Sequence, residues 1–169
     1  KSMLTGTEVV SALPDGYVQL EYIKSSGTQY IDTGFKPNNN TRVLIDYESL
    51  ATSTAFVFGS RHNSSANSTS YSFSSVILGS NSIRSDFGSV ESSITGTVMK
   101  RVILDKNKNV TTYDGTSVTA TSQTFQSSYP LTLCAVNTAG TKSLYSSLKI
   151  YSCQIYDNGT LIRNFVPCM

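Results

Sequence analysis

The chain alternates apolar and polar residues with a period of two along much of its length. In the clearest run, Val43, Ile45 and Tyr47 fall on one face, while Asp46 and Glu48 fall on the other. This period is typical of a β-strand with one buried face. The other runs with a strand-like pattern are residues 17–24, 55–59, 71–78, 98–105, 110–113, 131–136, 148–156 and 161–166. At least nine strands are therefore expected, with at most a turn or two of helix.

Residues that favour tight turns separate these runs. Residues 105–109 read Asp-Lys-Asn-Lys-Asn, residues 114–115 read Asp-Gly, and residues 157–159 read Asp-Asn-Gly. Such residues tolerate the left-handed backbone that short hairpins need, so consecutive strands should be antiparallel. No Trp is present to suggest an immunoglobulin domain. The pattern predicts an all-β fold, a two-sheet antiparallel jelly-roll sandwich.

Composition limits the classes of partner. The chain has 169 residues, enough for one domain, and carries 28 Ser and 20 Thr but only 14% charged residues. Its net charge of +2 is too small for the basic surface that nucleic acid requires. No apolar run approaches the roughly 18 residues that span a bilayer, so neither nucleic acid nor membrane is expected as a partner. We expect residues 1–12 to be a leader or linker and residues 13–169 to be the single domain.

The cysteines do not form a metal-binding pattern. Cys134, Cys153 and Cys168 include no CxxC pair, and His62 is the single histidine, so neither a structural metal nor a cofactor is expected. Cys134 and Cys153 lie in strand-like runs, where a buried free thiol behaves as a small apolar side chain. The alternative is one disulfide, such as Cys153 to Cys168.

Candidate catalytic residues are few. A retaining glycosidase needs two carboxylates about 5 Å apart. Asp46 and Glu48 are the only pair of carboxylates that are neighbours on one strand face. The glucanase pattern Glu-x-Asp-x-x-Glu and any Trp platform for sugar are absent, so we interpret the pair as a solvated strand face. His62 is the one possible base for a serine hydrolase, and it lies in a polar turn without a nucleophile-elbow pattern. The protein is therefore not expected to be an enzyme.

Binding of a glycan requires fewer features. A sugar site combines an aromatic face with amide, carboxylate or guanidinium groups that bond to hydroxyls. The middle of the chain supplies such residues on expected loops and strand ends, and the candidate ligand-binding residues are Arg61, His62, Asn63, Tyr71, Arg84, Asp86 and Phe87. The alternative is that Tyr71 and Phe87 belong to the core and the others to ordinary surface.

Both ends of the chain carry a family resemblance. Residues 13–17 (Leu-Pro-Asp-Gly-Tyr), 20–23 and 26–34 (Ser-Gly-Thr-Gln-Tyr-Ile-Asp-Thr-Gly), together with the closing runs 148–159 and 161–168, resemble laminin-G-like, concanavalin-A-like jelly-roll modules of gut-bacterial surface and prophage structural proteins. In that family a glycine-rich strand follows the Pro-Cys pair. This chain stops at Met169, so the resemblance implies a final strand that is either missing here or supplied by another chain.

The resemblance implies a fold and an extracellular location, but it does not identify a ligand, because one fold hosts many functions. We expect a non-catalytic binding or adhesion module directed at carbohydrate. Its location would be extracellular, on a cell surface or a virion, with a glycan or host surface receptor as partner. One alternative is a purely structural capsid-decoration or fibre domain, with virion or cell-surface protein partners and a homo-oligomeric state. The other alternative is a glycoside hydrolase acting through Asp46 and Glu48.

Overall fold

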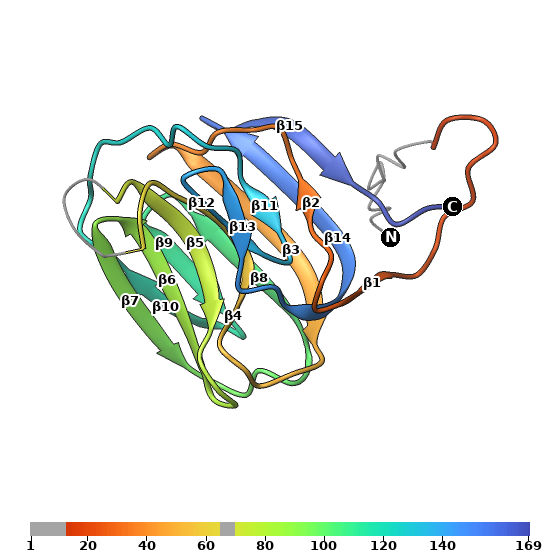
Figure 1. The fold of residues 1–169 in the computed structure, drawn as a ribbon, viewed down its shortest axis with the longest axis horizontal. Helices are drawn as coiled ribbons and strands as arrows, with labels where there is room; N and C mark the ends of the chain where they lie inside the picture. The colour runs from red at the N-terminus through yellow and green to blue at the C-terminus, as the bar shows by residue number, and fades with distance from the viewer. Residues whose placement is uncertain (1–12, 65–69) are drawn as a thin grey trace, which may run out of the picture.

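The strands form two largely antiparallel sheets that pack face to face as a sandwich, which confirms the predicted fold class (Figure 1). The computed structural model describes residues 13–64 and 70–169, and in this part of the chain there are fifteen strands. The same ranges contain no helix, and hence none long and apolar enough to cross a membrane. The expected leader, residues 1–12, lies outside the described residues.

The first sheet has seven strands. In spatial order they are β1 (Ile23–Ser26), β14 (Ser147–Asp157), β3 (Thr41–Ser49), β8 (Arg101–Asn107), β9 (Val110–Tyr113) and β10 (Thr116–Thr119), with β15 (Thr160–Phe165) also paired to β14. The predicted turns are present. Asp114 and Gly115 join β9 to β10, and Asn158 and Gly159 join β14 to β15, all with positive φ. These residue types adopt that backbone at little cost, which explains the two hairpins.

The second sheet has eight strands. In spatial order they are β13 (Thr141–Ser143), β12 (Val136–Thr138), β4 (Ala55–Arg61), β5 (Ser72–Ile77), β6 (Ser82–Gly88) and β7 (Val90–Thr95), with β11 (Thr132–Leu133) between β2 (Ile31–Asp32) and β4. The run 131–136 is not one strand, as predicted, but two. Cys134 has a φ of 63°, so the chain turns there, and β12 pairs with β4 in parallel.

The main core lies between the two sheets. The alternation along β3 is confirmed, because Val43, Ile45 and Tyr47 are fully buried, and Phe58 and Phe73 of the second sheet belong to the same apolar cluster. Burial of each such side chain contributes about 1.5–3 kcal/mol to stability. The sandwich is therefore held mainly by these inward faces.

A smaller apolar cluster lies on the outer face of the second sheet. Phe56, Val76 and Val136 are buried there, separate from the main core. A bulge between Phe56 and Phe58 interrupts the alternation of β4. Gly59 makes room for this packing, because a Cβ at Gly59 would lie 2.9 Å from both Phe56 Cδ1 and Val136 Cγ2. The outer face thus has a rigid apolar floor beside the polar residues described below.

The start of the domain departs from the prediction. Residues 17–24 were expected to form a strand, but β1 begins only at Ile23, and Gln19 makes a single bridge to Cys168. The backbone N–H of Val18 donates to the Met169 carbonyl at 2.9 Å. The two ends of the described chain therefore lie side by side (Figure 1).

All the cysteines are free, so the Cys153 to Cys168 disulfide is not formed. Cys134 and Cys153 are buried, as the first interpretation predicted, while Cys168 is partly exposed. Burial raises the pKa of the Cys134 thiol to about 12 and raises that of Cys153 as well. Only a thiolate reacts rapidly with a disulfide reagent, so these two thiols should be inert in the folded protein.

We expect Ellman's reagent at pH 8 to label Cys168 in the native protein, and to label Cys134 and Cys153 only after unfolding in guanidinium chloride. The measurement is the absorbance of released thionitrobenzoate with and without denaturant. A Cys168→Ser variant is the control and should release none while folded. Rapid labelling of that variant would contradict the buried placement of the other thiols.

Candidate functional site

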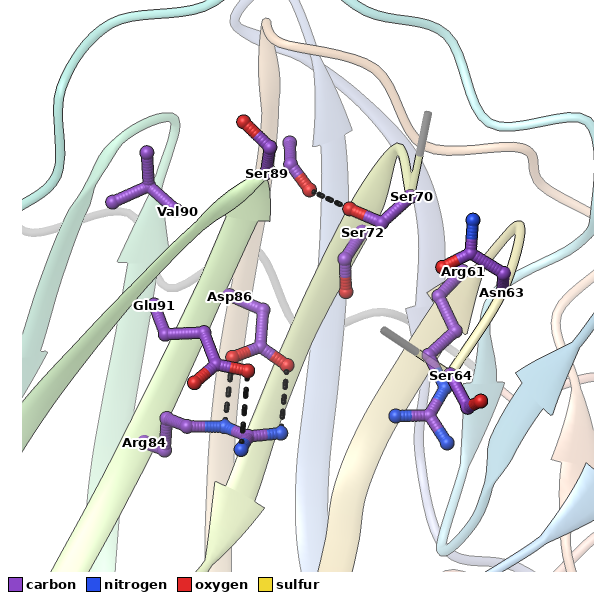
Figure 2. A pocket seen from close by; sticks show the side chains of 11 residues that line it. Arg61, Asn63, Ser64, Ser70, Ser72, Arg84, Asp86, Ser89, Val90 and Glu91 are labelled. Atoms are coloured by element: carbon purple, nitrogen blue, oxygen red, sulfur yellow. Dashed lines mark hydrogen bonds and ion pairs between the residues drawn. The ribbon is translucent and has the colours of Figure 1, made fainter. Parts of the chain in front are cut away.

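A polar pocket opens on the outer face of the second sheet, where β4, β5, β6 and β7 end or begin. Side chains alternate across a strand, so residues that flank core positions such as Phe73 and Phe87 face outward. Arg61, Asn63, Arg84 and Asp86, all predicted from the sequence, line this pocket. Figure 2 shows Arg61 and Asn63 on one side and Arg84 and Asp86 on the other.

Arg84 organises one wall of the pocket. Its Nε lies 2.9 Å from Asp86 Oδ1, and its Nη1 lies 3.2 Å from Glu91 Oε1 (Figure 2). Asp86 also accepts a hydrogen bond from Ser74 Oγ at 2.7 Å and is only 4% exposed. A buried carboxylate requires such partners. This wall therefore presents fixed carboxylate and guanidinium groups whose charges cancel in part.

Arg61 forms the opposite wall and is held differently. Its Nε donates to Thr138 Oγ1 at 2.8 Å, and its guanidinium carbon lies 5.0 Å from the centre of the Phe56 ring. Burial lowers the pKa of Arg61, with the charge of Asp86 opposing this effect. Within residues 13–64 and 70–169, Arg61 forms no ion pair with a carboxylate. Of the two arginines that line the pocket, Arg61 is therefore the one without a carboxylate partner among the described residues.

The buried hydroxyl of Ser72 also lines the pocket. Ser72 is 6% exposed, and its Oγ forms no hydrogen bond with the described residues. The neighbouring Ser70 differs, since its Oγ donates to the Gly88 carbonyl at 2.7 Å. A buried polar group without a partner costs about 1–3 kcal/mol. Ser72 would regain that free energy by bonding to a polar ligand.

The pocket is narrow. Its volume is about 10 Å³, the space of about one water molecule. A site of this size admits one small group of a ligand, such as a hydroxyl or a carboxylate, while the rest of the ligand stays at the surface. The donors and acceptors on its walls suit such a group.

The other predicted residues do not line the pocket. His62 and Tyr71 are exposed and contact each other, with ring centroids 6.1 Å apart, and His62 also lies 5.8 Å from the Tyr129 ring. The prediction for Phe87 is wrong. Phe87 is 1% exposed and packs against Phe125 in the core, so its ring cannot meet a ligand from solvent.

Sequence reasoning missed Ser72 and Glu91, which also line the pocket. Ser72 is one of many serines in the chain, and nothing in its local pattern marks it. Glu91 pairs with Asp86 in the register of β6 and β7, and β7 was not among the predicted strands. Both residues become visible only when the pairing of the strands is known.

The carboxylates Asp46 and Glu48 lie elsewhere, on the outer face of the first sheet. Asp46 accepts two hydrogen bonds from Arg101 at 3.0 and 2.9 Å, and Glu48 accepts from Lys149 at 2.9 Å and Tyr151 at 3.0 Å. The bonds from Lys149 and Tyr151 lower the pKa of Glu48. A glycosidase acid needs a raised pKa, so this arrangement favours the interpretation as a solvated strand face.

Comparison with solved structures places the sandwich among known folds. The fold is similar to that of sialidase CBM40 modules. The chain superposes on the CBM40 of the Ruminococcus gnavus IT-sialidase with a TM-score of 0.57 and 12% identity, covering 86% of this chain and 94% of that one. A second structure of that CBM40, bound to α2,3-sialyllactose, gives a TM-score of 0.57 at 14% identity with the same coverage.

A mutant of the NanB sialidase from Streptococcus pneumoniae also matches, with a TM-score of 0.57 and 16% identity over 86% of this chain. This chain spans only 26% of the length of NanB. No protein-family model and no curated protein matches the sequence. At these identities the likeness establishes the β-sandwich, while the predicted laminin-G-like relationship stays a prediction. Among the described residues no cluster of His, Cys, Asp or Glu could hold a metal ion.

Proposed function

We propose that the protein is a carbohydrate-binding module and that its pocket on the second sheet binds the end of a glycan. The observation that carries the proposal is the meeting at one pocket of Arg61, the Arg84–Asp86–Glu91 network and the Ser72 hydroxyl, which has no hydrogen-bond partner among the described residues. Sugars offer closely spaced hydroxyls that both donate and accept, which matches fixed walls of this kind. The shared fold with CBM40 modules supports the same function.

We propose further that the preferred ligand ends in an acidic sugar. Arg61 has no carboxylate partner among the described residues, and a guanidinium that binds a carboxylate forms strong, charge-assisted hydrogen bonds. One of the similar CBM40 structures is bound to α2,3-sialyllactose, which is therefore the first ligand to test. Lactose is its matched control, because it lacks the acidic sugar.

Isothermal titration calorimetry is expected to show binding of α2,3-sialyllactose that is at least about tenfold tighter than that of lactose, because a hydrogen bond to a charged group is worth about 1.5–3 kcal/mol. The Arg61→Ala variant should lose about tenfold or more for sialyllactose and little for lactose. Lys24→Ala, which removes an exposed cation from β1 on the first sheet, is the charge-matched control.

The Ser72→Ala variant separates binding from folding. Removing an unpartnered buried hydroxyl should leave Tm unchanged or raise it, while affinity falls by about fivefold, the value of one ordinary hydrogen bond. A glycan array that stays blank for wild-type protein would overturn the proposed function. Equal affinity for sialyllactose and lactose would overturn only the preference for an acidic sugar.

We also propose that the module is non-catalytic and works outside a cell or on a virion. The pairing of Asp46 with Arg101 and of Glu48 with Lys149 supports the first part, since each carboxylate is engaged in an ion pair. A surface rich in Ser and Thr with 14% charged residues supports the second. Release of sugar from α2,3-sialyllactose or from β-glucans by the purified protein, lost in an Asp46→Asn/Glu48→Gln variant, would contradict the non-catalytic role.

A further inference from the structure

A second cleft, remote from the Arg61 pocket, lies on the first sheet where β3 begins and the β8–β9 and β14–β15 hairpins turn. It has a volume of about 320 Å³ and is lined by Asn40, Arg42, Asn107, Tyr156 and Asn158, among others. Arg42 pairs in register with Asn107 on one side and with Tyr156 on the other. These side chains therefore project in a row across neighbouring strands.

The floor of the cleft is fixed by its own contacts. Arg42 donates to Asp105 through Nε and Nη2 at 2.8 and 2.7 Å, and its guanidinium carbon lies 5.4 Å from the centre of the Tyr156 ring. The Tyr156 hydroxyl donates to Gln154 Oε1 at 2.8 Å. The aromatic face is thus held in place, and the charge of Arg42 is balanced by Asp105.

Three side-chain amides surround this floor. The side-chain amides of Asn40, Asn107 and Asn158 form no hydrogen bond with the described residues, although Asn158 and Asn107 lie at hairpin turns. These amides are not needed to hold the turns. The backbone N–H of Asn158 donates to the Asn40 carbonyl at 3.2 Å, and that of Lys108 donates to the Thr41 carbonyl at 2.9 Å.

From this geometry we infer that the cleft is a second glycan-binding site, specific for a neutral sugar residue. A tyrosine ring supplies a flat apolar surface for the C–H face of a pyranose. Each amide offers both donors and an acceptor, which is the pairing that vicinal hydroxyls require. Asp105 neutralises Arg42, so Lys108 is the remaining cation of the lining that could pair with an acidic sugar. Its ammonium is exposed. The inference does not rest on the Arg61 pocket, which is on the other sheet.

The test is an NMR titration of the full wild-type chain, in which the residues followed line this cleft and not the Arg61 pocket. Lactose, maltose and cellobiose are the probes, added to millimolar concentration, and the side-chain amide signals of Asn40, Asn107 and Asn158 are followed. At least one disaccharide is expected to shift all of these signals. Tyr156→Ala should weaken that binding by at least tenfold.

Two further variants guard against loss of folding. Asn158→Gly keeps a residue suited to the positive φ of 47° at this turn, so the hairpin should persist while affinity falls by severalfold. Tyr151→Ala removes another tyrosine from the outer face of β14, outside the cleft, and should leave affinity unchanged. The inference is overturned if none of the disaccharides shifts the amide signals, or if Asn158→Gly and Tyr156→Ala bind as the parent does. Either result would leave the proposed function of the Arg61 pocket standing, because that pocket is a separate site.

Discussion

Replacing Lys106 by methionine is expected to stabilise the protein at pH 7 by about 2–4 kcal/mol. Lys106 lies in β8 and is fully buried between the sheets. Its ammonium contacts Ser85 Oγ at 2.5 Å and lies 4.8 and 5.7 Å from the centres of the Phe73 and Phe87 rings, and no carboxylate of the described chain pairs with it. The site is therefore a costly place for a charge.

Burial lowers the pKa of Lys106 from 10.5 to about 7, with the charge of Asp86 opposing the change. Each unit of pKa corresponds to about 1.4 kcal/mol of difference between the protonation states. At pH 7 the unfolded lysine is fully protonated, whereas the folded lysine has to give up its proton or keep it without hydration. Methionine has a similar length and no charge, and Ser85 would keep its bond to Thr111 Oγ1 at 2.6 Å.

The same lysine predicts how stability depends on pH. A base whose folded pKa is lowered favours folding only when it is neutral, so wild-type stability should rise as pH increases from about 7 towards 10. Above about pH 10 the trend should reverse. Burial raises the pKa of Tyr47 and raises that of Tyr113 to about 12. These phenols therefore ionise at a lower pH in the unfolded chain than in the folded protein, which favours unfolding as the pH rises.

Urea unfolding of wild type and Lys106→Met at pH 7, 8 and 9 measures both effects. The variant should be more stable at pH 7, and its advantage should shrink as pH rises. Lys36→Met, an exposed lysine, is the control and should change stability by less than about 0.5 kcal/mol. A destabilised Lys106→Met variant would mean that the contacts with Ser85, Phe73 and Phe87 outweigh the cost of burial.

Lys106 also illustrates why part of the fold escapes prediction. Residues 105–109 contain residues typical of turns, and the turn is present at Lys108, which has a φ of 56°. Strand β8, however, continues to Asn107 and carries the charged side chain of Lys106 into the core. Local composition favoured a turn, whereas pairing with β3 and β9 extended the strand. Hydrophobic alternation predicts a strand only where its buried face is apolar.

Two of the strands around the pocket, β6 and β7, were not predicted, for a similar reason. On β6, Ile83 and Phe87 face the core, but Ser85 lies between them, facing the buried ammonium of Lys106. The outward Arg84 and Asp86 were expected on loops or strand ends, and they lie instead within strand β6. The residue types of the pocket could be predicted from the sequence. These residues come together only because β4, β5, β6 and β7 pair side by side, which brings together residues that are far apart in the chain.

Removing Arg84 is expected to destabilise the protein by about 3 kcal/mol, because the buried carboxylate of Asp86 would lose its guanidinium partner and, among the described residues, keep only the hydrogen bond from Ser74. Arg84→Met retains most of the apolar stem and removes the guanidinium. Asp86→Asn should cost less, because Arg84 is partly exposed and would still lie 3.2 Å from Glu91. Urea unfolding of both single variants and of the double variant gives the coupling between the two residues.

The double variant Arg84→Met/Asp86→Asn should recover about 1–3 kcal/mol relative to the sum of the single variants, because the unpaired buried charge is then gone. Glu91→Gln is the control, since its pair with Arg84 is exposed and should be worth less than about 1 kcal/mol. If Arg84→Met were no more destabilising than Glu91→Gln, Asp86 would have to be hydrated through the pocket. The network would then contribute little to the stability of the sheet, and its conspicuous charges would be explained by ligand binding alone.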